Sequence, residues 1–184
     1  MSFNKLAGWP GRWLAGLRQN WKSHLGTLAL VVAVMVAVQV WHTRNVPDGP
    51  APDFTTVLAS GGAVTLQQWR AAHPGQVVAL HFWADWCPIC RTEEHSVSRI
   101  SRDWPVLSVA MQSGDATRVQ GVLTRRELAW HTAIDVDGRI AKSYGLTSVP
   151  ALVVLDAQGQ IRFAEVGYTS EIGMRLRLWW AQTF

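Results

Sequence analysis

Trp86-Cys87-Pro88-Ile89-Cys90 is the stretch that decides the fold, and it holds the only two cysteines among the 184 residues. An apolar run over residues 77–83 precedes it, and a helical pattern follows it. A cysteine pair spaced by two residues at such a junction is a structural staple, half of a metal site or a redox centre. The staple is the weakest of these interpretations, because a bridge that closes so small a loop stabilises little.

The geometry of a helix favours redox chemistry at this pair. If a helix begins at Cys87, one turn brings Cys90 to the same side, within the roughly 4.4–6.8 Å between Cα atoms that a disulfide needs. The free N–H groups and the dipole at a helix N-terminus favour negative charge, so we expect Cys87 to be the nucleophilic thiolate. Cys90 suits the resolving role, in which it attacks the mixed disulfide with a substrate. Pro88 is tolerated in the first turn, where its missing N–H would have no partner.

The net charge of +4 belongs to the beginning of the chain. Residues 1–44 hold five basic residues and no acidic one, whereas the rest holds 12 Lys and Arg against 13 Asp and Glu. Binding to nucleic acid would need a basic face on the folded part. The charge therefore gives no support for a nucleic-acid partner. The length suits one ordinary domain with an appendage.

Residues 25–41 predict a single transmembrane helix. They read LGTLALVVAVMVAVQVW, 17 residues without charge, which is at the short end of what spans a bilayer. A cleaved signal peptide is one alternative, but Ala37-Val38-Gln39 fails the small-X-small pattern at its last position. A buried core helix is the other, and no amphipathic stripe supports it. We expect an uncleaved anchor.

The flanking charges predict the orientation of this anchor. Four basic residues precede it and only Arg44 follows closely, so the positive-inside rule predicts residues 1–24 in the cytoplasm and the domain on the other side of the membrane. Within the tail, apolar residues recur every fourth position and could form an interfacial stripe, namely Trp9, Trp13, Leu17 and Trp21. An irregular tail broken at Pro10-Gly11 fits equally well.

Residues 42–52 are expected to form a linker between the anchor and a domain over residues 53–184. The segment NVPDGPAP at residues 45–52 is too rich in proline for a helix or a central strand. It predicts a semi-extended spacer that holds the domain a short distance above the lipid.

The pattern of the domain predicts the α/β class, with a mixed central sheet and helices on both faces. Apolar runs and alternation predict strands at residues 54–58, 63–66, 77–83, 106–111, 151–155 and 161–166. Capping residues and periodicity predict helices at residues 65–69, 87–103, 115–127 and 139–144 and from residue 170 onward. In the last helix we expect Ile172, Leu176, Trp179 and Trp180 to point inward and Arg175 and Arg177 outward.

These features together resemble a thioredoxin fold. The resemblance is carried by FWADWCPIC at residues 82–90, by YGLTSVP at residues 144–150, and by the hairpin and helix that follow. The N-terminal extension and the inserted helix at residues 115–127 resemble the membrane-tethered TlpA, ResA and CcmG branch. A finer likeness, carried by VAMQSGD at 109–115 and GYTSEIGMRLRLWW at 167–180, is to the suppressor-of-copper-sensitivity D (ScsD) type.

The resemblance implies a substrate-binding surface around the cysteines. It implies that Pro150 is cis and faces Cys87, so that the backbone of Val149 could pair with an extended substrate. Trp86 and Pro88 would contribute to the same docking surface, and Trp83 and Trp86 would pack around the disulfide. No cofactor beyond the redox-active disulfide and no metal site is implied.

One departure from thioredoxin concerns proton transfer. The buried acid of thioredoxin falls on His81, and its lysine partner falls on Met111. His81 is a candidate proton relay, because imidazole titrates near neutrality, but a hydrogen-bonded core histidine is the more ordinary interpretation. Glu93 and Glu94 could help to deprotonate the resolving thiol, although we expect both on the solvated surface of the helix.

The predicted function is a membrane-tethered thiol-disulfide oxidoreductase that reduces or isomerises protein disulfides. The resemblance implies recharging by a membrane electron donor of the DsbD/ScsB kind and a link to copper or redox stress tolerance. Pro88 and Ile89 add no donor around the thiolate, which predicts a reducing couple. Two alternatives stay open: a module that binds Cu(I) through both thiolates, and a reductase in cytochrome c maturation. Ala151 and Leu152 count mildly against the second, because that type tends to carry an acid after the proline.

Overall fold

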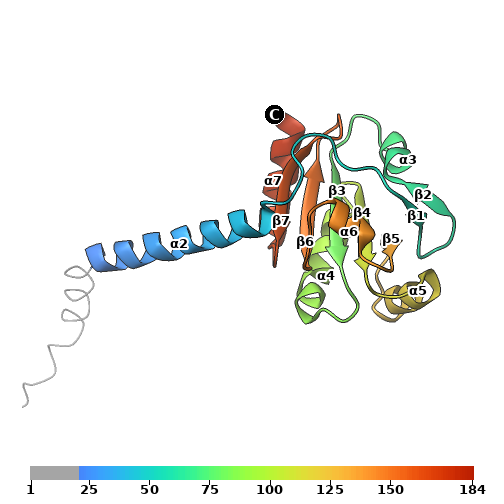
Figure 1. Ribbon diagram of the computed structural model, residues 1–184, viewed down its shortest axis with the longest axis horizontal. Helices are drawn as coiled ribbons and strands as arrows, with labels where there is room; N and C mark the ends of the chain where they lie inside the picture. Colours follow the sequence, from blue (N-terminus) through green and yellow to red (C-terminus); the bar gives the residue numbers. More distant parts are fainter. Residues whose placement is uncertain (1–20) are drawn as a thin grey trace, which may run out of the picture. The chain divides into compact units, whose positions relative to one another are not determined.

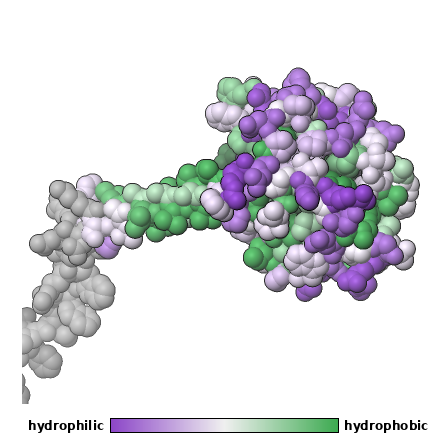
Figure 2. All heavy atoms as spheres, viewed as in Figure 1, coloured by the Kyte–Doolittle hydropathy of each residue, from purple (hydrophilic) through white to green (hydrophobic). Residues whose placement is uncertain are grey.

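The computed structural model describes residues 21–184 (Figure 1), and the chain divides into two compact units, residues 1–41 and 42–184. The described part of the first unit, residues 21–41, belongs to α2 (Trp21–Thr43), whose last two residues fall in the second unit. In residues 21–184 it is the only helix long and apolar enough to cross a membrane, a test that a signal sequence would also pass. Figure 2 shows its continuous apolar surface. The predicted tail positions Trp9, Trp13 and Leu17 lie outside the described residues.

The segment predicted to be a spacer instead lies against the domain. Val46 packs on the core, Pro50 forms an antiparallel bridge with Gln160, and the Ala51 N–H donates to the carbonyl of Gly159 at 2.9 Å. Proline suits this position at the edge of a sheet, because an edge strand leaves part of its backbone unpaired. The domain is therefore joined to α2 by a very short piece of chain.

The sheet of the domain is mixed, as predicted. Its five strands lie in the order β5-β4-β3-β6-β7, with β3, β4 and β5 parallel to one another and β6 antiparallel to both of its neighbours. The bounds are β3 (Val78–Trp83), β4 (Val106–Met111), β5 (His131–Asp135), β6 (Ala151–Leu155) and β7 (Ile161–Val166). A separate hairpin of β1 (Thr55–Val57) and β2 (Ala63–Thr65) precedes this sheet.

Helices cover both faces of the sheet. The central strand β3 is therefore buried along its whole length. Val78, Leu80 and Phe82 face a core that α3 (Leu66–Ala71) and α6 (Arg139–Ser143) complete. Ala79 lies in the opposite core with residues of α4 (Pro88–Ile100) and α7 (Glu171–Thr183). A third cluster joins Trp83 and both cysteines to α5 (Ala116–Arg125).

The capping residues explain where the helices begin. Thr65 and Gln68 form a capping box at α3, and the side chains of Asp115 and Ser170 cap α5 and α7. Val119, Val122 and Leu123 form the buried face of α5, as the periodicity predicts.

Strand β5 is absent from the strands predicted above. Its side chains include Thr132 and Asp135, whose polarity hides the alternation that marks a strand. Both are buried and satisfied inside the protein: the Thr132 hydroxyl lies 2.7 Å from that of Ser108, and the Asp135 carboxylate accepts the N–H groups of Ile140 and Ala141. The carboxylate thereby fixes the start of α6.

The predicted orientation of α7 is wrong. Its buried face is formed by Met174, Leu178 and Ala181. Four residues expected to point inward are exposed, at 72% for Ile172, 60% for Leu176, 54% for Trp179 and 52% for Trp180. Because the helix is apolar on two opposite sides, hydrophobicity alone does not tell which side packs on the sheet.

Candidate active site

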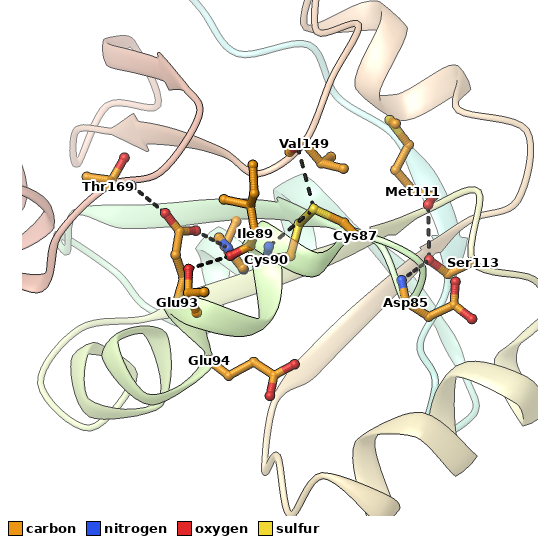
Figure 3. The surroundings of a disulfide bond; sticks show 12 residues. Asp85, Cys87, Ile89, Cys90, Glu93, Glu94, Met111, Ser113, Val149 and Thr169 are labelled. Atoms are coloured by element: carbon orange, nitrogen blue, oxygen red, sulfur yellow. Dashed lines mark hydrogen bonds and ion pairs between the residues drawn. A yellow bond between two sulfur atoms is a disulfide. The ribbon is translucent and has the colours of Figure 1, made fainter.

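Cys87 and Cys90 form a disulfide at the start of α4 (Figure 3), with 5.4 Å between their Cα atoms. Cys87 is the N-cap of the helix, and its sulfur accepts the N–H of Cys90 at 3.2 Å. Pro88 occupies the first turn. The helix thus directs a backbone donor at the sulfur of Cys87, which favours negative charge there once the bond is reduced.

The disulfide lies just beneath the surface of the domain. Cys87 and Cys90 are 4% and 2% exposed, whereas Pro88 and Ile89 between them are exposed. Trp83 is buried in the same cluster as the cysteines, as expected. Trp86 departs from the expectation that it packs around them, because it is 56% exposed.

Trp86 instead forms part of the surface next to the disulfide. Its indole N–H donates to the carbonyl of Gln112 at 3.1 Å, which holds the ring toward the loop after β4. Gln112 has a positive φ of 49° in that loop. The exposed ring is thereby fixed in one place without being buried.

Val149 and Pro150 lie opposite Cys87. The Val149-Pro150 peptide bond is cis, as the resemblance implied, and the Val149 carbonyl oxygen is 3.7 Å from the sulfur of Cys87. Pro150 directly precedes β6, and its carbonyl accepts the N–H of Gly167 at 2.8 Å. The sheet therefore positions these two residues, and Figure 3 shows Val149 directed at the disulfide.

A polar network that the sequence analysis did not single out holds the loop before Cys87. The buried Ser113 hydroxyl accepts the N–H of Asp85 and donates to the carbonyl of Met111, each at 3.0 Å. The Asp85 carboxylate forms an ion pair with Arg118 on α5 at 2.8 Å. These bonds tie the loop after β3 to the end of β4.

The expectation that Glu93 lies on the solvated helix surface is wrong. Glu93 is 1% exposed, and its carboxylate accepts the N–H of Thr169. Its other oxygen lies 3.4 Å from Nε2 of His81, which is equally buried. Glu94 is only partly exposed and forms an ion pair with Arg126 at 2.7 Å. The spacing of three residues from Cys90, which places Glu93 on the same side of the helix, was the available signal.

His81 therefore lies next to an acid in the core rather than among apolar groups alone. Within residues 21–184 its Nδ1 has no hydrogen-bond partner, and its ring meets Trp130 edge-on with 5.6 Å between ring centroids. Glu93 lies on α4, the helix that begins at the cysteines, and His81 lies on β3, the strand that precedes them, so the two form a buried pair. No group of three His, Cys, Asp or Glu side chains in residues 21–184 is placed to hold a metal ion.

The chain resembles known thiol-disulfide proteins over most of its length. It is 30% identical over 146 residues to the thiol:disulfide interchange protein DsbE of Allochromatium vinosum, covering 76% of this chain and 79% of the relative. It is 29% identical over 159 residues to a thioredoxin-like protein of Haemophilus influenzae, covering 86% and 93% of the two chains.

Comparison of structures agrees with this resemblance. The fold matches a crystal structure of a thiol:disulfide interchange protein DsbE candidate from Chlorobium tepidum with a TM-score of 0.65 and 23% identity. The match covers 74% of this chain and 99% of the other. Because that identity is low, this similarity supports the fold alone.

The profile of the AhpC/TSA family matches residues 47–164, which include both cysteines, Pro150 and the strands that position them. The relatives named DsbE and ResA place the chain in the TlpA, ResA and CcmG branch of thioredoxin-like proteins. The chain therefore belongs to the AhpC/TSA family of thioredoxin-fold proteins, and it is a thiol-disulfide oxidoreductase.

Proposed function

We propose that the chain reduces or isomerises disulfides of other proteins in the periplasm, with α2 as an uncleaved anchor in the inner membrane. The position of Cys87 supports this reaction. Its sulfur caps α4 and faces the carbonyl of Val149, and Cys90 lies one turn further along the helix. Cys87, beside Val149 at the end of the helix, is therefore proposed to meet the substrate, and Cys90 to resolve the mixed disulfide.

The reaction proceeds in two exchanges. The thiolate of reduced Cys87 attacks a substrate disulfide, which forms a mixed disulfide and releases one substrate thiol. The thiolate of Cys90 then attacks the sulfur of Cys87, which releases the second substrate thiol and forms the disulfide seen here. Two electrons pass to the substrate, and a membrane donor of the DsbD/ScsB kind restores both thiols.

Substrate recognition is proposed to use the backbone of Val149. An extended segment that paired with it would place its own disulfide beside Cys87, because the Val149 carbonyl is already 3.7 Å from that sulfur. Trp86 and Pro88, the neighbours of Cys87 in the chain, are exposed and are proposed to extend this surface. We propose Trp86, Pro88, Val149 and Pro150 as the substrate-binding residues, and the contact of Val149 with the sulfur of Cys87 supports this.

Glu93 is proposed to accept the proton of Cys90 when that thiol attacks. Glu93 follows Cys90 by three residues on α4 and is shielded from water, so its carboxylate is a base inside the protein rather than on its surface. His81, 3.4 Å away, would relay the proton or hold the carboxylate in place.

The direct test of this function is the reduction of insulin driven by dithiothreitol, followed by turbidity. We expect the full chain to accelerate it and the Cys87→Ser and Cys90→Ser variants to fall to the uncatalysed rate. Equal rates for all three proteins would refute the proposal. Retention of the chain by membranes after alkaline carbonate extraction tests the anchor separately.

Reduction of a cytochrome c precursor is a second candidate, supported by the relatives named DsbE and ResA. The ScsD likeness instead supports a role in copper tolerance. Deletion of the gene distinguishes them: loss of c-type haem proteins supports the first, and copper sensitivity with normal haem proteins supports the second. A module that binds Cu(I) would hold one copper per chain and show no insulin reduction.

A further inference from the structure

The outer face of α7 is an apolar surface that nothing in the domain covers. Ile172, Leu176, Trp179 and Trp180 are each more than half exposed. Their spacing of three and four residues places them on one side of the helix, opposite the buried Met174, Leu178 and Ala181. We call these four exposed residues the α7 outer face. A contiguous patch of this kind marks an interaction surface.

The contacts within the domain place one end of α7 near the tether, which is the segment that joins α2 to the domain and includes Pro50. Pro50 pairs with Gln160, the residue directly before β7. In β7, Arg162 donates to the carbonyl of Phe184, the residue that follows α7, at 3.0 Å. The segment that joins the domain to α2 and the C-terminal end of α7 thus flank the same part of β7.

Charged residues flank the α7 outer face but do not interrupt it. On one side Arg175 bonds Glu171 and Asp103, and on the other Arg177 bonds Glu165. Each arginine forms an ion pair beside the apolar residues, so charged groups border the α7 outer face on both sides. An apolar face with two tryptophans and a charged border matches the membrane interface, where the amphipathic indole is favoured.

We propose that the α7 outer face rests on the lipid surface of the membrane that α2 anchors. This inference rests on the proposed anchoring. The domain is packed from Val46 onward, and α2 ends at Thr43, so the chain between them is too short to hold the domain far from the bilayer. A surface of the domain next to the tether must then lie at the lipid.

A second copy of the chain is a less suitable occupant. A helix of 13 residues is about 20 Å long and about 10 Å wide, a footprint of about 200 Å². Stable protein interfaces bury about 800 Å² per partner. A lipid surface has no such requirement, because the tether already keeps the domain beside it and the bilayer needs no matching shape.

The test uses the full chain in vesicles of phosphatidylcholine and phosphatidylglycerol, with and without brominated acyl chains that quench tryptophan emission on contact. The chain has 11 tryptophans, so the readout is the difference between variants. We expect Trp179→Phe/Trp180→Phe to lose part of the quenched emission of the wild type. Trp86→Phe removes one equally exposed tryptophan from the disulfide surface and should leave the quenched emission unchanged.

The same quenched emission in wild type and double variant would overturn the proposal, as would a dimer in vesicles that Leu176→Ser converts to a monomer. Insulin reduction by the double variant shows that it is folded, and the two single variants replace it if it is not. Carbonate extraction separates the two proposals. Loss of the chain from the membrane refutes anchoring and with it this docking, whereas retention without a difference in quenching refutes the docking alone.

Discussion

The sulfur of Cys87 lies 3.7 Å from the carbonyl oxygen of Val149, the residue that forms the cis bond with Pro150. A cysteine at a helix N-terminus and a backbone group just before a sheet strand therefore meet just beneath the surface. The reactive atom and the backbone that would hold a substrate are positioned by rigid elements, α4 and β6, rather than by a free loop.

Trp86 is expected to contribute to substrate binding but not to stability. Its ring is 56% exposed and lies beside Cys87, so Trp86→Ala should raise the KM for insulin by about 3- to 30-fold, the range of an exposed aromatic contact in an interface. The kcat should change little. Trp180→Ala, which removes a 52% exposed tryptophan from α7, is the matched control and should leave the KM as it is. Similar effects of the two variants would contradict the proposed docking surface.

Glu93→Gln should slow the second exchange and not the first. The glutamine keeps the shape and can still accept the N–H of Thr169, but it cannot take up a proton from Cys90. General-base catalysis typically contributes about 10²–10⁴-fold, so we expect the mixed disulfide to resolve about 10²-fold more slowly. Rapid-quench kinetics with a disulfide peptide measures both steps.

Glu94→Gln serves as the control for that experiment, since Glu94 forms an ion pair with Arg126 away from the core. A Glu93→Gln variant that slows both exchanges equally would indicate a structural role only.

Asp135→Ala should destabilise the domain, although it lies far along the chain from the cysteines. The buried carboxylate accepts the N–H groups of Ile140 and Ala141, and their loss leaves two donors unsatisfied. We expect a loss of about 1–3 kcal/mol in the free energy of unfolding, measured in urea. Asp137→Ala is the control: Arg139 holds the pKa of Asp137 below its usual value, but the pair is exposed and contributes little.

Gly145→Ala should loosen the tether. Gly145 has a φ of +68°, and a Cβ there would collide with the backbone of Asn45 and Val46. Gly75→Ala has nearly the same φ, +70°, but meets open space, so it isolates the backbone strain from the collision. We expect limited proteolysis to cut near residue 45 faster in Gly145→Ala only. Equal cutting in both variants would show that the packing of the tether is not what protects it.

The sequence predicts the fold correctly where the pattern of a segment fits only one structure. A run that is apolar at every position, as in β3, fits a strand buried on both faces, and the cysteine pair fixes the start of α4. The prediction fails where local pattern and burial disagree. Met174 and Leu178 are no more apolar than the exposed Leu176 and Trp179, so only packing against the sheet decides the face of α7.

The same limit explains the buried polar residues of the site. Glu93 is covered because Thr169, 76 residues further along the chain, supplies an N–H to its carboxylate. Thr132 can be buried in β5 because its hydroxyl forms a hydrogen bond with that of Ser108 on the neighbouring strand. Partners this distant in sequence leave no local signal, so both residues resemble surface residues until the sheet is assembled.

The central claim is that Cys87 attacks and Cys90 resolves. The most direct measurement is covalent trapping: each reduced single-cysteine variant is mixed with an oxidised protein probe, insulin, and the adduct is identified by mass. We predict that Cys90→Ser accumulates a mixed disulfide through Cys87, whereas Cys87→Ser forms none at the same concentration. Trapping through Cys90 alone, or equal trapping through both, would contradict the account.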